Sequence, residues 1–199
     1  MPAHSKPVLL AFCGKSATGK DSTIKWLHNQ FNGMNIPNRI IVSDTTRPPR
    51  VGEKNGIDYY FISEEEFVRN LNRNKYLEWT CFRGWYYGTH KAEIDNGIIL
   101  MGIFNPQGIK TLREQYNRIF TIIPVYLEDG VSIRLNRSRE REGRWRFEFF
   151  RRIFADWIDF RGIKKVIKSF RYHIILKNEV GVVRRARAIL FDLQQFNII

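Results

Sequence analysis

The sequence of 199 residues is poor in cysteine and has no long apolar run. Its two cysteines, Cys13 and Cys81, are too few for a disulfide framework, which favours a reducing compartment. No apolar segment reaches the roughly 20 residues that a membrane-spanning helix needs, and Met1 to Pro7 form no apolar targeting segment. We therefore expect a cytoplasmic protein that does not interact with a membrane.

Histidine and acidic residues are also scarce. The four histidines show neither metal-ligand spacing nor an arrangement with a nucleophile. Lys and Arg number 33 against 20 Asp and Glu, which gives a net charge of +13. Between Arg134 and Arg187 there are 17 basic and 6 acidic residues, so this segment alone supplies +11. Because no nucleic-acid motif accompanies the charge, we favour a positive field that attracts nucleotides, although the basic segment leaves nucleic-acid binding open.

The most informative stretch follows the apolar run at residues 8–12. It reads Gly14, Lys15, Ser16, Ala17, Thr18, Gly19 and Lys20. A strand, a loop with glycines at both ends and a closing lysine predict a phosphate-binding P-loop. Small residues let backbone N–H groups turn toward a phosphate, the next helix directs its positive end there, and Lys20 reaches the β- and γ-phosphates. The alternative is an ordinary glycine turn, but the position after an N-terminal strand favours the P-loop.

The residue after Lys20 departs from the usual P-loop pattern. A Ser or Thr normally stands there and binds Mg²⁺ through its hydroxyl, whereas this chain has Asp21 followed by Ser22. A carboxylate is a hard oxygen ligand that also serves Mg²⁺, and it suits the first turn of a helix electrostatically. We therefore expect Asp21 to be the protein's metal ligand and Ser22 to belong to the ATP-binding loop.

A second group of functional side chains follows a strand predicted at residues 39–42. Arg47 and Arg50 surround a Pro-Pro pair, which stiffens the backbone, so both guanidinium groups can contact one phosphate. Taken alone, a solvated turn with two arginines is the better explanation. Glu78 lies within the apolar run at residues 76–80, where an unpaired carboxylate is costly, so it requires a ligand or a salt bridge.

These motifs resemble guanylate kinases in order and spacing, most densely from Leu9 to Thr89. The resemblance rests on the P-loop and on residues 43–50, 55–59, 76–79 and 86–89. It implies transfer of a phosphoryl group from ATP to GMP, with Mg²⁺ as the cofactor. It also implies that the phosphate of GMP is held by Arg47, Arg50, Tyr59 and Tyr87, and its guanine by Ser43, Glu78 and Thr89.

The chemistry of the base agrees with this assignment. Guanine presents N1–H and N2–H₂ as adjacent donors, for which the Glu78 carboxylate is a bidentate acceptor, and its O6 can accept from the Thr89 hydroxyl. Adenine has the opposite pattern on this edge, so it would leave Glu78 unpaired.

The chain departs from the family after a strand predicted at residues 98–104. Guanylate kinases usually carry Asp-x-Asp here, whereas this chain has Ile103 and Asn105. The resemblance implies that Asn105 belongs to the GMP-binding residues. A carboxylate lost here and gained at Asp21 suggests a rebuilt magnesium environment. Two alternatives therefore stay open, a nucleoside monophosphate kinase of other or deoxy specificity such as dGMP, and a nucleotide-binding module with weakened catalysis.

The basic segment matches the family's lid, whose arginines neutralise charge on the transferring phosphoryl group. The resemblance implies catalytic roles for Arg139 and Arg152, beside Lys20 and Arg47, with Arg137 as a near substitute. It also places Asn178 near the adenine of ATP.

Alternating strands and helices after a P-loop predict an α/β fold with three layers and a parallel core sheet. We expect a P-loop kinase core at residues 1–42 and 91–199, a small mixed α/β GMP-binding insertion at 43–90 and a helical lid at about 138–157. The expected partners are ATP and GMP, and the expected state is a monomer or homodimer.

Overall fold

The structure is a computed structural model that describes residues 6–50, 52–91, 98–142, 147–178 and 181–199. Within these ranges the side chains of residues 141–142 and 147–152 are not described.

The core is a five-stranded sheet with strand order β2-β7-β1-β8-β9, in which every neighbouring pair is parallel. Its strands are β1 (Val8–Gly14), β2 (Asn38–Ile40), β7 (Ile99–Ile103), β8 (Thr121–Glu128) and β9 (Ile174–Lys177). All of β1 is buried. A continuous apolar run is what a parallel strand needs when helices cover both faces of its sheet.

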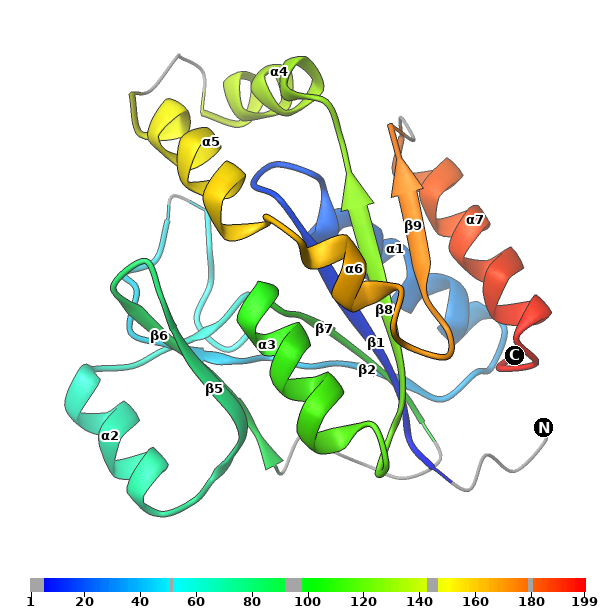
Figure 1. Ribbon diagram of the computed structural model, residues 1–199, viewed down its shortest axis with the longest axis horizontal. Coiled ribbons are helices and arrows are strands. Elements are labelled where there is room, and N and C mark those ends of the chain that lie inside the picture. The colour runs from blue at the N-terminus through cyan, green and yellow to red at the C-terminus, as the bar shows by residue number, and fades with distance from the viewer. Residues whose placement is uncertain (1–5, 51, 92–97, 143–146, 179–180) are drawn as a thin grey trace.

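Helices cover the two faces of this sheet, as the sequence predicts for a three-layer fold (Figure 1). One face packs against α1 (Lys20–Gly33) and α7 (Val182–Gln195). The other packs against α3 (Pro106–Thr111), the π-helix η2 (Leu112–Tyr116) and α6 (Ile163–Ile167). The side chains of β1 point alternately to the two faces of the sheet. Leu10 and Phe12 pack toward α1. Leu9 and Ala11 pack toward α3. The predicted fold class is confirmed.

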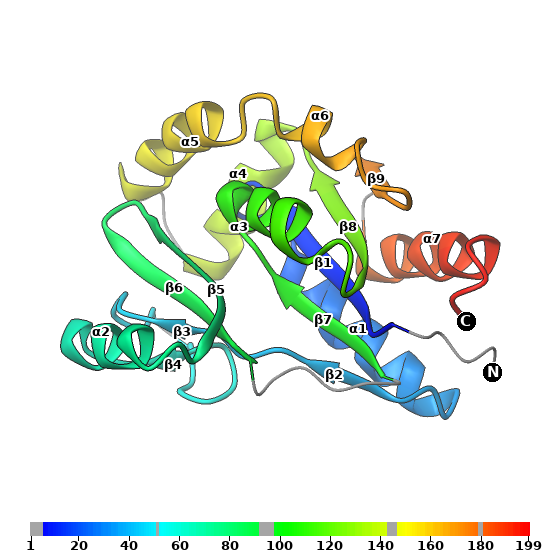
Figure 2. The same cartoon turned by 60° about the horizontal axis from the view of Figure 1, so that its bottom comes forward.

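A second sheet lies to one side of the core (Figure 2). It has strand order β4-β3-β6-β5, formed by β3 (Asp44–Thr45), β4 (Tyr60–Phe61), β5 (Tyr76–Phe82) and β6 (Trp85–His90). The β3–β4 pair is parallel and the other pairs are antiparallel. This mixed sheet and α2 (Glu64–Asn72) fall within the insertion predicted at residues 43–90, although the division into domains stays a prediction.

Aromatic stacking forms the small core of this insertion. The ring of Phe67 on α2 stacks on Tyr76 at 4.6 Å and on Tyr86 at 5.2 Å between ring centroids. Gly88 permits this packing, because a Cβ at that position would lie 2.8 Å from the Tyr76 ring. Ser63 caps the N-terminus of α2, with its hydroxyl accepting from the Glu66 N–H at 3.2 Å.

Two further helices, α4 (Val131–Glu142) and α5 (Phe147–Asp159), follow β8. In Figure 1 they lie beyond the carboxyl end of β8, near the loop that joins β1 to α1. The segment predicted as the lid, residues 138–157, spans the end of α4 and most of α5. Among the described residues, no helix combines the length and apolar character needed to cross a membrane.

Candidate active site

The predicted P-loop connects the end of β1 to the start of α1. Two of its residues have left-handed backbone conformations, Ala17 with φ of 61° and Gly19 with φ of 78°. Alternation of this kind directs consecutive backbone N–H groups toward one point and forms an anion-binding nest. Gly19 also permits a close approach, because a Cβ there would lie 3.0 Å from Nη1 of Arg185.

Lys20 lies folded over this loop. Its Nζ donates to the carbonyl oxygens of Gly14 at 2.7 Å and Lys15 at 3.1 Å. Thr18 closes the same turn, because its hydroxyl donates to the Lys15 carbonyl at 2.9 Å. Burial lowers the pKa of Lys20. The loop's own carbonyls thus position a compact cationic group beside the nest, where it can contact a bound phosphate.

Three guanidinium groups hold the outer side of the loop. They belong to Arg134 and Arg137 on α4 and to Arg185 on α7, and they donate to the carbonyl oxygens of Ser16, Ala17 and Thr18 respectively. The C=O and N–H of a trans peptide point in opposite directions. Anchoring the carbonyls from outside therefore turns the N–H groups toward the loop interior, where an anion would bind.

Two buried aspartates fix these arginines in place. Asp129 accepts from Arg137 and Arg185, and Asp156 accepts from Arg134 at 2.6 Å. Arg134 and Arg185 are 1% and 2% exposed, so each needs a paired acid to offset the loss of hydration. Neither aspartate was predicted from the sequence. Asp156 is an acidic residue inside the basic segment, a signal that does not identify its partner, and Asp129 precedes that segment.

The predicted phosphate-binding side chains of the insertion lie together. The guanidinium of Arg47 is 5.5 Å from the ring centroid of Tyr59. The rings of Tyr59 and Tyr87 meet edge to face at 6.0 Å. Burial raises the pKa of Tyr59, so its hydroxyl stays protonated at neutral pH and can donate to a phosphate oxygen.

Glu53 orients both arginines of this group and was missed in the sequence analysis. Both of its carboxylate oxygens accept from Arg47 Nη2 at 3.0 Å, and one also accepts the backbone N–H of Arg50 at 2.7 Å. Arg47 is 7% exposed, so this pairing satisfies a buried charge. The spacing of Glu53 three residues after Arg50 was the available signal.

The predicted guanine-binding side chains form one hydrogen-bonded chain. Glu78 on β5 and Thr89 on β6 face each other in register, and the Thr89 hydroxyl donates to Glu78 Oε1 at 2.8 Å. The Ser43 and Thr89 hydroxyls are 3.2 Å apart. Since Thr89 has one hydroxyl proton, Ser43 is the donor of that second bond. Thr89 thus orients Glu78, besides the predicted contact of Thr89 with guanine O6.

Glu78 is buried, with 6% of its surface exposed. Burial raises the pKa of Glu78 from 4.5 to about 7, against the opposing effect of the bond from Thr89. A carboxylate in this setting gains from a ligand that offers two adjacent donors.

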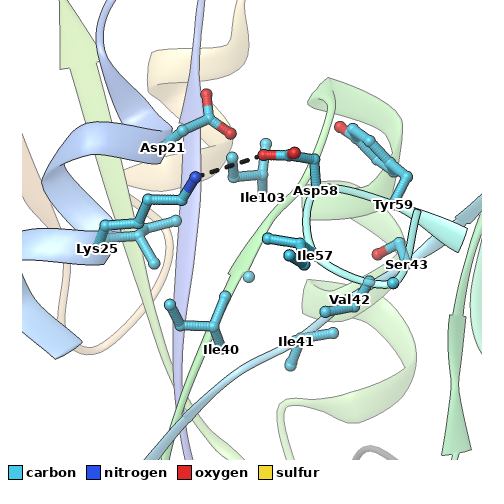
Figure 3. A pocket seen from close by; sticks show the side chains of 13 residues that line it. Asp21, Lys25, Ile40, Ile41, Val42, Ser43, Ile57, Asp58, Tyr59 and Ile103 are labelled. Atoms are coloured by element: carbon cyan, nitrogen blue, oxygen red, sulfur yellow. Dashed lines mark hydrogen bonds and ion pairs between the residues drawn. The ribbon is translucent and has the colours of Figure 1, made fainter. Parts of the chain in front are cut away.

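A cavity of about 260 Å³ separates α1 from the insertion (Figure 3). Its polar lining includes Asp21, Lys25, Ser43, Asp58 and Tyr59, and its apolar lining includes Ile24, Ile41, Val42, Ile57 and Ile103. Lys25 of α1 forms an ion pair with Asp58 of the insertion at 3.4 Å. The helix that follows the P-loop and two predicted GMP-binding residues, Ser43 and Tyr59, therefore line the same cavity.

Asp21 presents one accessible carboxylate beside the P-loop. It stands in the first turn of α1, exposed and adjacent to Lys20. Among the described residues no cluster of three or more potential metal ligands is found. Mg²⁺ usually binds one or two carboxylates together with phosphate oxygens and water, so a single accessible carboxylate beside an anion nest fits this ion. The neighbouring Ser22 is also exposed.

The remaining predicted residues lie elsewhere. Asn105 caps α3, accepting the Gly108 N–H at 2.8 Å. Asn178 lies after β9 and accepts the Gly130 N–H at 3.0 Å. Arg139 is exposed on α4, and the side chain of Arg152 lies outside the described part. Arg137, the near substitute considered from the sequence, contacts the P-loop, with its Nη1 3.4 Å from the Ala17 carbonyl oxygen.

Comparisons with known proteins agree with this arrangement. A family model described as guanylate kinase matches residues 4–143. The guanylate kinase of Prochlorococcus marinus subsp. pastoris is 36% identical over 141 residues, covering 67% of this chain and 74% of that protein. The guanylate kinase of Symbiobacterium thermophilum is 38% identical over 120 residues, covering 58% of this chain and 55% of that protein.

A solved structure shares the fold. The crystal structure of guanylate kinase from Anaplasma phagocytophilum aligns with a TM-score of 0.68 at 20% identity. The alignment covers 99% of this chain and 89% of the other. It therefore includes the carboxyl-terminal part that lies beyond the family match.

Proposed function

The chain belongs to the guanylate kinase family of nucleoside monophosphate kinases, and from this premise we propose that it transfers the γ-phosphoryl group of ATP to GMP. The observation that carries the proposal is the shared cavity. Asp21 of the helix after the P-loop lines it on one side, and Ser43 and Tyr59 of the insertion line it on the other. ATP at the P-loop, which ends next to Asp21, and GMP in the insertion would then meet across this cavity with their phosphates facing each other.

The ATP side consists of the nest of residues 14–20 and the groups around it. Backbone N–H groups hold the phosphates, and the ammonium of Lys20 offsets their charge. Arg134 and Arg137 add positive charge beside the loop, and Asn178 is the candidate contact to adenine. Mg²⁺ held at Asp21 would neutralise charge on the β- and γ-phosphate oxygens.

The GMP side separates the recognition of phosphate from that of base. Arg47, Arg50, Tyr59 and Tyr87 bind the phosphate, with Glu53 holding the two arginines in position. Ser43, Glu78 and Thr89 bind guanine, and Asn105 is a further candidate contact. Glu78 must be ionised to accept both guanine donors, because a protonated carboxyl keeps a hydrogen where one of them must bind.

The reaction needs no covalent intermediate. Phosphoryl transfer passes through an in-line transition state, and catalysis comes from positioning and charge stabilisation. Lys20 and the lid arginines, for which Arg139 and Arg152 stay candidates beside Arg134 and Arg137, supply the charge. Arg47 supplies it from the side of the acceptor.

The apolar wall of the cavity favours dGMP as a second substrate. Ile57 and Ile103 stand on this wall, and Ile103 occupies a position where the family usually has an acid. Such a wall offers no hydrogen bond to a ribose hydroxyl that it contacts, so loss of that hydroxyl costs little.

A coupled assay with ATP against a panel of nucleoside and deoxynucleoside monophosphates tests the proposal. We expect turnover of GMP and dGMP with at least a 100-fold preference over AMP. Glu78→Gln should abolish this preference, whereas Glu65→Gln, which alters an exposed residue of α2, should retain it. Calorimetric binding of GMP without turnover would instead indicate a nucleotide-binding module.

A further inference from the structure

The turn between β5 and β6 presents an arginine to α5. Arg83 has a φ of 56° at the tip of this hairpin, and Figures 1 and 2 both show the tip beside α5. Its Nε and Nη2 donate to Asp159 at 3.0 and 2.8 Å, and Nη2 also donates to Asp156 Oδ1 at 2.8 Å. Arg83 therefore bridges two acids of α5. Asp156 and Asp159 are three positions apart in sequence, so they lie on the same face of this helix.

Asp156 extends this contact to the P-loop. The carboxylate is 1% exposed, and besides Arg83 it accepts the Ser16 backbone N–H at 3.0 Å and the Ser16 hydroxyl at 3.2 Å. It also accepts from Arg134, which donates to the Ser16 carbonyl at 2.8 Å. One buried carboxylate thus joins the insertion, the lid helices and the phosphate-binding loop.

The same hairpin carries the guanine-binding pair. Glu78 on β5 and Thr89 on β6 are direct partners in the antiparallel ladder whose tip holds Arg83. Continuous pairing from Glu78 to Phe82 makes the hairpin a single element. A displacement of its tip therefore changes where the base-reading carboxylate stands relative to the P-loop.

Binding of either nucleotide would favour the conformation in which Arg83 and Asp156 hold the insertion, α5 and the P-loop together. Asp156 holds Arg134 against the loop, which keeps a guanidinium near the phosphates of ATP. The hairpin contact holds the strands that carry the guanine-binding pair against α5. Two ligands that favour the same one of two conformations each strengthen the binding of the other.

We propose that Arg83, Asp156 and Asp159 form a latch through which ATP at the P-loop strengthens GMP binding in the insertion. The latch rests on the proposed function, because it acts between the two nucleotide sites assigned above. Its members are positioning residues, since they contact the P-loop and one another.

Calorimetry of GMP binding with and without a non-hydrolysable ATP analogue tests the latch. In the unmodified protein we expect the analogue to tighten GMP binding at least about fivefold. In Arg83→Gln this ratio should fall to near one, and Arg83→Lys should restore part of it. Arg73→Gln removes an exposed charge from the same insertion and should keep the full ratio.

Asp159→Asn provides a second variant with the same expected loss. Asp156 is avoided because its removal leaves the buried Arg134 unpaired and endangers folding. A ratio that is unchanged in Arg83→Gln and Asp159→Asn, or a ratio of one in the unmodified protein, overturns the latch. Failure of the unmodified protein to bind GMP at all overturns the proposed function instead.

Discussion

Glu78 combines a buried position with a proposed role, guanine binding, that requires a negative charge. Its raised pKa, about 7, follows from burial and lies within the physiological range. Below that value the free protein carries a protonated Glu78, which cannot accept both donors of guanine.

The KM for GMP should therefore depend on pH. We expect it to rise by about tenfold for each pH unit below 7 and to level off above pH 8, because GMP binds the ionised carboxylate. Initial rates between pH 5.5 and 8.5 measure this, with the KM for ATP as the internal control. Parallel changes in both constants would assign the effect to another group.

The same burial reduces stability. Burial raises the pKa of Glu78 from 4.5 to about 7 on folding, so the contribution of this one group to stability is greatest below pH 4.5 and is lost as the pH rises through 7. Glu78→Gln should raise the free energy of unfolding at pH 8 by up to about 3 kcal/mol. Urea denaturation at pH 8 and pH 5 measures it, and the gain should be much smaller at pH 5. An equal gain at both values would contradict this origin.

Substitution of Asp21 tests its predicted role as a magnesium ligand. If its carboxylate holds the ion, Asp21→Asn should raise the Mg²⁺ concentration needed for half-maximal rate by about tenfold or more and lower kcat. Asp21→Ser restores the hydroxyl that the family usually has at this position and should recover part of the loss. Magnesium titrations of the three proteins decide the matter, and identical curves would remove Asp21 from the site.

Elements were more predictable than the contacts between them. The apolar run of β1 and the glycines of the P-loop are local signals. The strands predicted at residues 8–12, 39–42 and 98–104 lie close to β1, β2 and β7 of the structure. By contrast, the bond between Ser16 and Asp156 joins residues that are 140 positions apart. No periodicity or motif encodes such a pair, because it depends on how the helices pack over the sheet.

Packing of the helices over the sheet also brings Arg185 of α7 against the P-loop. Arg185→Met removes a cation that pairs with Asp129 and anchors Thr18. We expect it to lower the free energy of unfolding by about 3 kcal/mol and to raise the KM for ATP more than that for GMP. Arg187→Met on the exposed side of α7 is the matched control. Equal changes in both KM values would indicate only a general loss of stability.

At the scale of the whole molecule, the parallel sheet brings the site together. The P-loop and the start of α4 follow the carboxyl ends of the parallel strands β1 and β8. The insertion leaves the core after β2, and the chain returns to the core at β7. The motifs resemble guanylate kinases most densely up to Thr89, and the family match ends at residue 143. The fold nevertheless aligns over 99% of the chain, so the later elements keep their places through packing rather than through recognisable motifs.

The proposed reaction requires ATP at the P-loop and GMP in the insertion to bind with their phosphates facing each other across the cavity. Inhibition kinetics with a bisubstrate analogue, adenosine and guanosine joined through a 5′-polyphosphate, can measure this arrangement. We expect the analogue to compete with both ATP and GMP and to bind more tightly than either nucleotide alone, because one molecule then occupies both sites. Competition with only one of the two nucleotides would contradict it.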